Sequence, residues 1–170
     1  MITKRMEETL NGQINKEFYS AYLYLAMSAF CNKLGMPGAE HWFRMQYDEE
    51  VIHMTKMFDY VMQHGGSARL LQIDEPPHEF GTLLEAFEDS LAHEQFVTKS
   101  INELLDVAIE EKDHATQVFL QWYITEQVEE EANVEEIVQR LKLAGDNGGA
   151  LMMFDDKLSQ RMPPTPPAAN

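Results

Sequence analysis

The sequence contains a single cysteine, Cys31, among its 170 residues. One cysteine excludes an intramolecular disulfide framework, a Cys-x-x-Cys redox pair and a thiolate-rich zinc site. Cys31 stands among core-type residues, so we expect it to be a small buried hydrophobe. This cysteine usage is typical of a protein that works in a reducing compartment.

Long apolar runs are also missing. The first ten residues, "MITKRMEETL", contain no apolar segment of the kind found in secretory signals. The longest nearly apolar stretch, "AYLYLAMSAF", is about half the length that a membrane span needs. We therefore expect a cytoplasmic protein without a membrane segment.

Basic residues are few. The chain has 13 Lys and Arg against 29 Asp and Glu, which gives a formal net charge of −16. Such a surface repels nucleic acid and anionic membranes, so neither is expected as a partner, and it attracts cations. Acidity of this size also keeps a cytoplasmic protein soluble, and the charge alone does not distinguish these two roles.

Glycine and proline are rare inside four long segments and are concentrated between them. The breaks fall at 34–38, 64–81, 111–113 and 144–149 and leave four segments of about 25–30 residues. No segment shows the alternation of apolar and polar residues that is typical of strands. The sequence thus predicts an all-α fold.

The lengths of the breaks predict how the helices are connected. Short turns join the first helix to the second and the third to the fourth, so each pair forms an antiparallel hairpin. The long middle connection can run the length of the bundle, which lets helices two and three lie parallel. We expect a single domain with three parts: a four-helix bundle over 1–145, a short fifth helix over 146–160 that packs in the oligomer, and a Pro-rich disordered tail over 161–170.

Each of the four long segments carries a stripe of apolar residues at helical spacing, and each stripe is interrupted by a glutamate. The interruptions lie at depths that can coincide in a bundle: Glu17, Glu50, Glu94 and Glu130. No Lys or Arg occupies a stripe position, and burying an unpaired carboxylate costs on the order of several kcal/mol. One such glutamate is usually a rim residue that reaches water, but four that converge indicate cations between them.

Charge and donor type indicate two divalent ions at this point. Four carboxylates carry a charge that two divalent cations balance, and bridging carboxylates can hold two metals ~3.5–4 Å apart. His53 follows Glu50 in an E-x-x-H pattern and adds a nitrogen ligand. Oxygen donors with an imidazole suit iron or manganese better than structural zinc.

The fourth helix departs from the pattern of di-iron bundles, in which two helices each supply Glu-x-x-His. The corresponding pair here is Gln127 and Glu130. Because an amide is a poor metal ligand beside a carboxylate, we expect the second metal to be bound more loosely than the first.

With these residues the chain resembles bacterial and archaeal non-haem ferritins over about residues 5–160. The resemblance lies in "LNGQINKEFYSAYLYLAMS", "EEVIHM", "HEQFVTKSINEL" and "FLQWYITEQVEEE", in the crossover length and in the short fifth helix. It implies a hollow homo-oligomeric shell of 24 subunits that oxidises Fe(II) with dioxygen or hydrogen peroxide. The Fe(III) would be stored inside the shell as a ferric oxyhydroxide mineral.

The resemblance also implies roles for individual residues in a ferroxidase centre. Glu17, Glu50 and His53 would hold one iron. Glu50 would bridge to a second iron, which Glu94 and Glu130 complete.

Further positions match a third iron site beside this pair. Its implied ligands are Glu49, Glu126 and Glu129, with Glu130 shared and Gln127 close to the second iron. Residues 126, 129 and 130 fall on one helix face, which agrees with this assignment. Without the resemblance, "EQVEEE" would be interpreted as a solvated run of charge.

Two more positions bear on the chemistry. Tyr24 matches a tyrosine beside the centre that can supply an electron or a hydrogen bond, and packing explains it equally well. Haem-binding relatives place a methionine after the bridging glutamate, where this chain has Val51, and a histidine at the position of Glu130. We therefore expect iron without haem.

Two other function classes remain open at this point. A soluble di-iron oxidase or peroxidase would keep the site but form no cage, so the mass of the assembly would distinguish it. A helical interaction module of the cytokine type would bind no metal tightly, and it leaves the four buried carboxylates unexplained.

Overall fold

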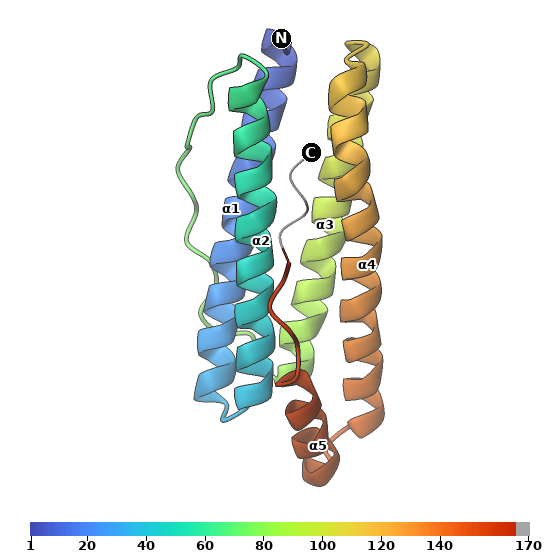
Figure 1. The fold of residues 1–170 in the computed structure, drawn as a ribbon. Helices are drawn as coiled ribbons and strands as arrows, with labels where there is room; N and C mark the ends of the chain where they lie inside the picture. The colour runs from blue at the N-terminus through green and yellow to red at the C-terminus, as the bar shows by residue number, and fades with distance from the viewer. Residues whose placement is uncertain (166–170) are drawn as a thin grey trace.

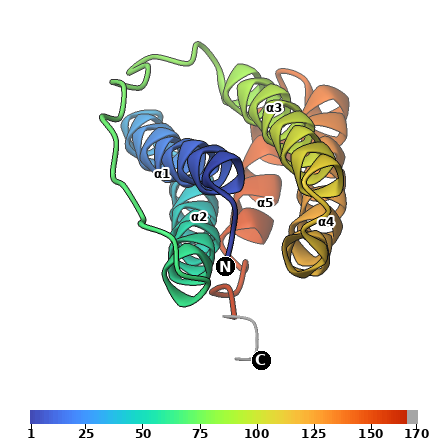
Figure 2. The same cartoon turned by 90° about the horizontal axis from the view of Figure 1, so that it is seen from above.

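The computed structural model describes residues 1–165, and these form five helices with no strand among them (Figures 1 and 2). The helices are α1 (Lys4–Lys33), α2 (Pro37–Gln63), α3 (Leu83–Glu110), α4 (His114–Ala144) and α5 (Gly148–Leu158). The predicted all-α class, the four long helices and the short fifth helix are confirmed. Within this range no helix is long and apolar enough to cross a membrane. Of the tail assigned to 161–170, residues 166–170 lie outside the described part of the chain.

Local sequence explains where the long helices begin and end. Thr82 and Glu85 form a reciprocal capping box at the start of α3, and Asp113 accepts a hydrogen bond from the first turn of α4. Pro37 opens α2, where a missing N–H leaves no helical hydrogen bond unmade. Gly145, with φ of 52°, ends α4 in a left-handed conformation that favours glycine.

The four long helices stand side by side, and the crossover sets their directions. The α1–α2 and α3–α4 pairs are antiparallel, and the segment 64–82 runs along the outside of the bundle from the end of α2 to the start of α3 (Figure 1). Helices α2 and α3 therefore point the same way, as predicted. This arrangement brings the middle of all four helices to one level.

Two apolar clusters fill the bundle, one above and one below that level. The cluster nearer α5 contains Tyr24, Phe43, Phe87 and Val134, and the other contains Leu10, Met57, Ile101 and Leu120. The buried glutamates lie between them. Dry packing on both sides closes the polar centre off from water along the bundle axis.

Helical spacing through Glu94 predicts a stripe on α3 of Leu84, Phe87, Leu91, Thr98, Ile101 and Leu105, and only part of this stripe is buried. Leu84, Leu91, Thr98 and Leu105 are only half-buried, whereas Leu83, Ser90, Val97 and Leu104 are buried. Leucines on both sides of Glu94 make the apolar arc of α3 broad, so periodicity alone does not locate its centre. Glu94 is fully buried under either interpretation.

Helix α5 is anchored to the start of α2. The Asp155 carboxylate accepts hydrogen bonds from the backbone N–H groups of Gly38 (2.9 Å) and Ala39 (2.8 Å), and so caps α2 from a distant part of the chain. A Cβ on Gly38 would lie 1.7 Å from the Asp155 carbonyl oxygen, so only glycine permits this approach. Leu158 of α5 is buried in the apolar cluster that contains Tyr24 and Phe43, whereas Met152 and Met153 on α5 are exposed.

Candidate metal centre

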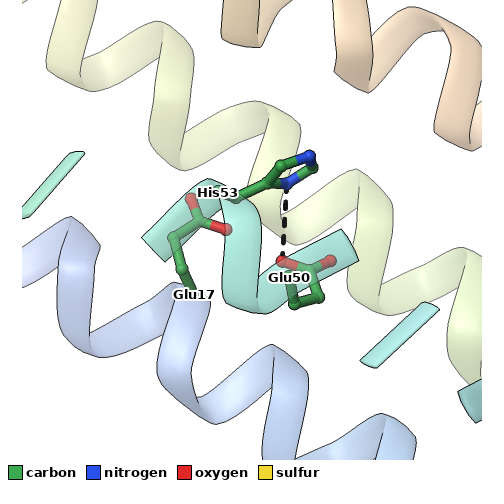
Figure 3. A group of neighbouring side chains, drawn as sticks. All are labelled: Glu17, Glu50 and His53. Atoms are coloured by element: carbon green, nitrogen blue, oxygen red, sulfur yellow. Dashed lines mark ion pairs between the residues drawn. The ribbon is translucent and has the colours of Figure 1, made fainter. Parts of the chain in front are cut away.

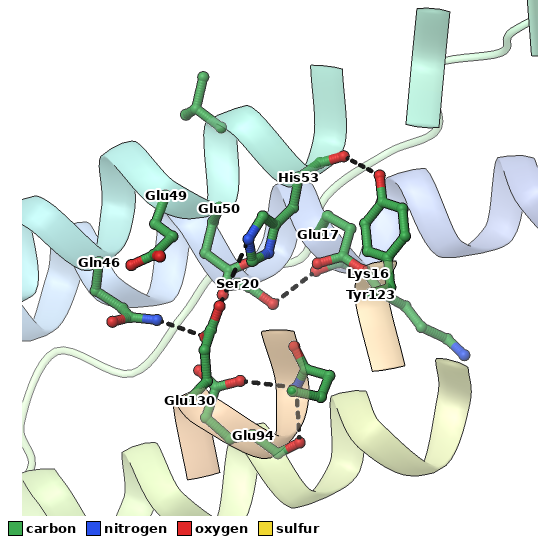
Figure 4. A network of polar contacts seen from close by, with 12 residues as sticks. Lys16, Glu17, Ser20, Gln46, Glu49, Glu50, His53, Glu94, Tyr123 and Glu130 are labelled. Atoms are coloured by element: carbon green, nitrogen blue, oxygen red, sulfur yellow. Dashed lines mark hydrogen bonds and ion pairs between the residues drawn. The ribbon is translucent and has the colours of Figure 1, made fainter. Parts of the chain in front are cut away.

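Five side chains from four helices converge at the mid-level of the bundle (Figure 4). Each is at most 5 % exposed, although all are polar or charged. They are Glu17 of α1, Glu50 and His53 of α2, Glu94 of α3 and Glu130 of α4. The convergence that the sequence predicts for the four glutamates is thus present in the structure.

Their donor atoms form groups of the size that a metal ion needs. In each group, one donor atom per residue lies within 4.8 Å of the others. The groups are Glu17, Glu50 and His53 (Figure 3), then Glu50, Glu94 and Glu130, and finally Glu49, His53 and Glu130. The first two share Glu50, which places its carboxylate where it can bridge two ions.

Several carboxylate oxygens in the cluster are buried without a hydrogen-bond partner among the described residues. These are Oε2 of Glu17, both oxygens of Glu50 and Oε1 of Glu130. Buried acceptors of this kind are rare because each loses its hydration without compensation. Bare carboxylate oxygens around one imidazole are the donor set that suits iron or manganese. The residues present therefore fit a pair of such ions.

The electrostatics of the cluster are those of crowded acids. Burial, followed by the charges of Glu94 and Glu17, raises the pKa of Glu50 well above the usual value. Burial likewise raises the pKa of Glu130, with repulsion from Glu94 opposed by His53. For Glu94, burial raises the pKa and hydrogen bonds from Tyr24 and Gln127 limit the rise. Without metal, folding therefore disfavours the charged carboxylate form of these three acids and favours the protonated form.

His53 lies between two of these acids. Its Nδ1 is 3.6 Å from Oε2 of Glu50, and its Nε2 is 3.5 Å from Oε1 of Glu130. Burial acts to lower the pKa of the imidazole, but the charges of Glu130 and Glu17 outweigh it and the pKa is raised. A metal ion bound to one ring nitrogen would take the place of the extra proton that these acids favour on the imidazole.

Hydrogen bonds from neighbouring side chains orient the Glu94 and Glu17 carboxylates. The Tyr24 hydroxyl donates to Oε1 of Glu94, and the Gln127 amide donates to Oε2 of the same residue at 3.1 Å. The Gln13 amide donates to Oε1 of Glu17 at 2.8 Å. Gln13 was missed at the level of sequence, although it lies one helical turn before Glu17, which is a usable signal.

The outer side of the cluster contains a contact that the sequence did not indicate. The Gln46 amide donates to Oε2 of Glu130 at 2.7 Å, and Arg161 bonds both Gln46 and Glu49. Glu49 is only partly buried, and its ion pair with Arg161 links the start of the C-terminal segment to α2. Spacing could not suggest this pair, because 112 positions separate the two residues.

Glu126 and Glu129, the other implied ligands of a third site, are not members of the three donor groups formed by the described residues. Glu126 is half-buried, and burial raises its pKa, with repulsion from Glu49 and Glu129 adding to the rise. Their role as ligands stays a prediction.

Comparison with known proteins places these features in a family context. The family model described as "Ferritin-like domain" matches residues 7–144. The bacterial non-haem ferritin of Bacteroides fragilis is 42% identical over 161 residues, which are 95% of this chain and 100% of the relative. That of Campylobacter jejuni is 41% identical over 155 residues, covering 91% and 93% of the two chains.

A solved structure is also similar to this chain. The crystal structure of an open pore ferritin from the hyperthermophilic archaeon Archaeoglobus fulgidus superposes with a TM-score of 0.94 at 48% identity. The match covers 95% of this chain and 100% of the archaeal one.

Proposed function

This chain belongs to the ferritin family, as a non-haem ferritin of the bacterial and archaeal kind, and on that premise we propose that it oxidises Fe(II) and stores the Fe(III). The reaction takes one electron from each of two Fe(II) ions. Dioxygen accepts both electrons and, with two protons, becomes hydrogen peroxide. The Fe(III) then hydrolyses to a ferric oxyhydroxide mineral inside a hollow oligomer.

The observation that carries this proposal is the set of unpartnered oxygens at the cluster. Glu17, Glu50 and Glu130 are buried with carboxylate oxygens that no described group satisfies. A cation is the partner that turns this unfavourable arrangement into a favourable one. Because Glu50 belongs to two donor groups, the arrangement supports two ions rather than one.

Each residue contributes a distinct part to the chemistry. Glu17 and His53 would hold the first Fe(II), Glu94 and Glu130 the second, and Glu50 would bridge them and fix their separation. The anionic carboxylate oxygens stabilise Fe(III) more than Fe(II), because the attraction grows with the charge of the ion. Tyr24 and Gln127 would keep the Glu94 carboxylate oriented and ionised.

Storage requires the product to leave the centre for an enclosed space. We propose a cage of 24 copies of this chain with an acidic lining, in agreement with the net charge of −16. Exposed apolar residues on α5, such as Met152 and Met153, favour burial between copies. A third iron site that uses Glu49, and a cytoplasmic location, belong to the same proposal.

The catalytic part is tested by adding Fe(II) to the metal-free protein in air and following the ferric absorbance. We expect the wild type to exceed buffer autoxidation and Glu50→Ala to fall at least about 100-fold, since it loses the bridge. Glu135→Ala, which removes an exposed carboxylate of α4, is the matched control and should behave as wild type. Equal rates for the wild type and Glu50→Ala would refute the proposal.

The storage part is tested by the mass of the assembly in solution. Light scattering should give a mass near 24 times that of the chain, and electron microscopy should show hollow particles that fill with dense cores after iron loading. A monomer or dimer with intact iron oxidation would instead identify a non-cage di-iron oxidase or peroxidase.

A further inference from the structure

The C-terminal segment begins beside the outer edge of the metal centre. After α5, the chain turns back along the bundle on the side formed by α2 and α4 (Figures 1 and 2). Arg161, three residues beyond the end of α5, lines a groove together with Trp42 of α2 and Arg140 of α4. The Arg161 guanidinium contacts none of the five residues assigned to the dinuclear centre, so its place beside the centre calls for a separate explanation.

Four contacts fix Arg161 in this position. The His41 imidazole donates to the Arg161 carbonyl oxygen at 2.9 Å, and the guanidinium carbon lies 4.3 Å from the centre of the Trp42 ring. Nη1 donates to Oε1 of Gln46 at 2.6 Å, and Nη2 donates to Oε2 of Glu49 at 2.5 Å. Stacking on Trp42 with two directed hydrogen bonds is a geometry that arginine provides and lysine does not.

Gln46 extends the influence of Arg161 into the cluster. Its amide oxygen accepts from Arg161, and its amide nitrogen donates to Glu130 at 2.7 Å. A guanidinium can only donate and a carboxylate can only accept, so the amide between them has one productive orientation. Gln46 is 1 % exposed, so bulk solvent does not compete for either bond.

The two acids that Arg161 addresses, directly or through Gln46, belong to the outer donor group. Glu49 and Glu130 form that group with His53. Because His53 also belongs to the first inner group and Glu130 to the second, a third ion would depend on Glu49 for its one unshared ligand. The side chains of Arg161 and Glu49 are 20% and 22% exposed, so their charges are screened less than those of a surface pair. A metal ion in the outer group would therefore share the Glu49 carboxylate with a positive charge already present, and its other carboxylate, Glu130, is held by the amide that this charge orients.

We propose that Arg161 is a positioning residue that holds Glu49 and Glu130 and lowers the affinity of the outer group for a metal ion. This inference rests on the proposed function, because it concerns a third ion beside the dinuclear centre. Like charges that share a carboxylate repel, so each weakens the binding of the other. The coupling is reciprocal: an ion bound in the outer group loosens Arg161 from Glu49 and from the face of Trp42.

This arrangement has a consequence for iron turnover. Among the described residues, no Lys or Arg forms an ion pair with the glutamates of the two inner groups, so no such charge lies directly against their ions. An ion in the outer group is opposed by one and leaves more readily. The outer group is then suited to transient occupancy by iron on its way into or out of the centre.

The test is calorimetric titration of the metal-free assembled protein with Zn(II), which binds without redox chemistry. We expect Arg161→Gln to bind the third equivalent about ten-fold more tightly than wild type, the size expected for one charge acting on a divalent ion across several ångströms. Arg140→Gln removes the same charge from the same groove without touching Glu49 and is the matched control. Arg161→Lys keeps the charge and should resemble wild type more closely than Arg161→Gln.

A second readout leaves Arg161 in place. Trp42 and Trp122 are the two tryptophans of the chain, so Trp122→Phe makes the emission report on Trp42 alone. We expect its emission to change as the third Zn(II) equivalent binds, and Arg161→Gln in this background to abolish that change. A third equivalent that binds with wild-type affinity in Arg161→Gln, or leaves Trp42 emission constant, would overturn the inference. Failure of the first two equivalents to bind would instead refute the proposed function.

Discussion

The Tyr24 hydroxyl donates a hydrogen bond to the Glu94 carboxylate and so joins α1 to α3 within the metal centre. Both residues are fully buried, and burial, with the charge of Glu94 next in size, raises the pKa of Tyr24 well above the usual value. Tyr24 is therefore a neutral hydrogen-bond donor at neutral pH.

Tyr24→Phe should weaken metal binding in the group of Glu50, Glu94 and Glu130. A hydrogen bond to a charged group contributes roughly 1.5–3 kcal/mol, so its loss predicts a decrease in affinity of at least about ten-fold. The decrease should be larger near pH 6 than near pH 8, because Glu94 then binds its proton more tightly and the metal must displace it. Zn(II) titration at both pH values checks this, and a pH-independent decrease would indicate a packing role alone.

The metal-free protein should lose stability as the pH rises. Burial raises the pKa values of Glu50, Glu94 and Glu130 above 4.5, so the folded protein binds more protons than the unfolded chain above that pH. The resulting stability is present near pH 4.5 and is lost as the pH rises through the folded-state pKa values. His53, whose pKa is raised from 6.5, acts in the same direction above that pH.

Thermal unfolding of the metal-free protein between about pH 5 and pH 8 measures this loss. We expect the melting temperature to decrease by several degrees across the range and the decrease to disappear with saturating Zn(II). A melting temperature that rises steadily with pH would contradict the assignment of raised pKa values.

Glu94→Gln should stabilise the metal-free protein and weaken its metal binding. Glutamine has nearly the same shape and retains an acceptor for Tyr24, but it removes one of the crowded charges. We expect a melting temperature a few degrees above wild type near pH 7.5 and a weaker second Zn(II) equivalent. Glu103→Gln, an exposed position on the same helix, is the control and should change neither quantity. A lower melting temperature in Glu94→Gln would show that repulsion is not a dominant cost.

Gly38→Ala should detach α5 from the start of α2. The new Cβ would overlap the Asp155 carbonyl oxygen, so the two helices must separate or distort, at a cost of about 1–3 kcal/mol. A Cβ added at the mid-helix Gly12 would meet no neighbour within 4 Å, so Gly12→Ala should stabilise the protein by roughly 0.5–1 kcal/mol. Denaturant unfolding of both variants gives the comparison, and equal effects would contradict the close approach at Gly38.

The central acids could be predicted from the sequence because each one interrupts an otherwise apolar stripe. Glu17 and Glu130 show this most clearly, since their neighbours on the stripe, such as Ile14 and Val134, are all buried. On α3 the expected stripe matches the buried face only in part, because leucines flank both sides of that face. Glu94 belongs to the buried face in either case, because it lies at helical spacing both from Leu91 and Thr98 and from Ser90 and Val97.

The supporting contacts could not be predicted in the same way. Gln46 is an ordinary polar residue until Arg161, 115 positions away, supplies its donor. Asp155 caps a helix that begins more than a hundred residues earlier, and nothing in "MMFDDKL" reveals which of its two aspartates does so. Such pairs depend on how the chain folds back on itself, which periodicity within one helix does not encode.

The origin of the ligands has a mechanical consequence. Glu17, Glu50 and His53 come from the α1–α2 hairpin, whereas Glu94 and Glu130 come from the α3–α4 hairpin. Ions coordinated by both sets act as cross-links between two halves that the chain joins only through its outer crossover. Filling the centre thus joins the two halves and raises the free energy of unfolding of the subunit, by about 2.7 kcal/mol when the free ion stands at 100 times its dissociation constant. When the Fe(III) ions leave, this cross-link is lost, and the two halves can again separate slightly as the next two Fe(II) ions bind.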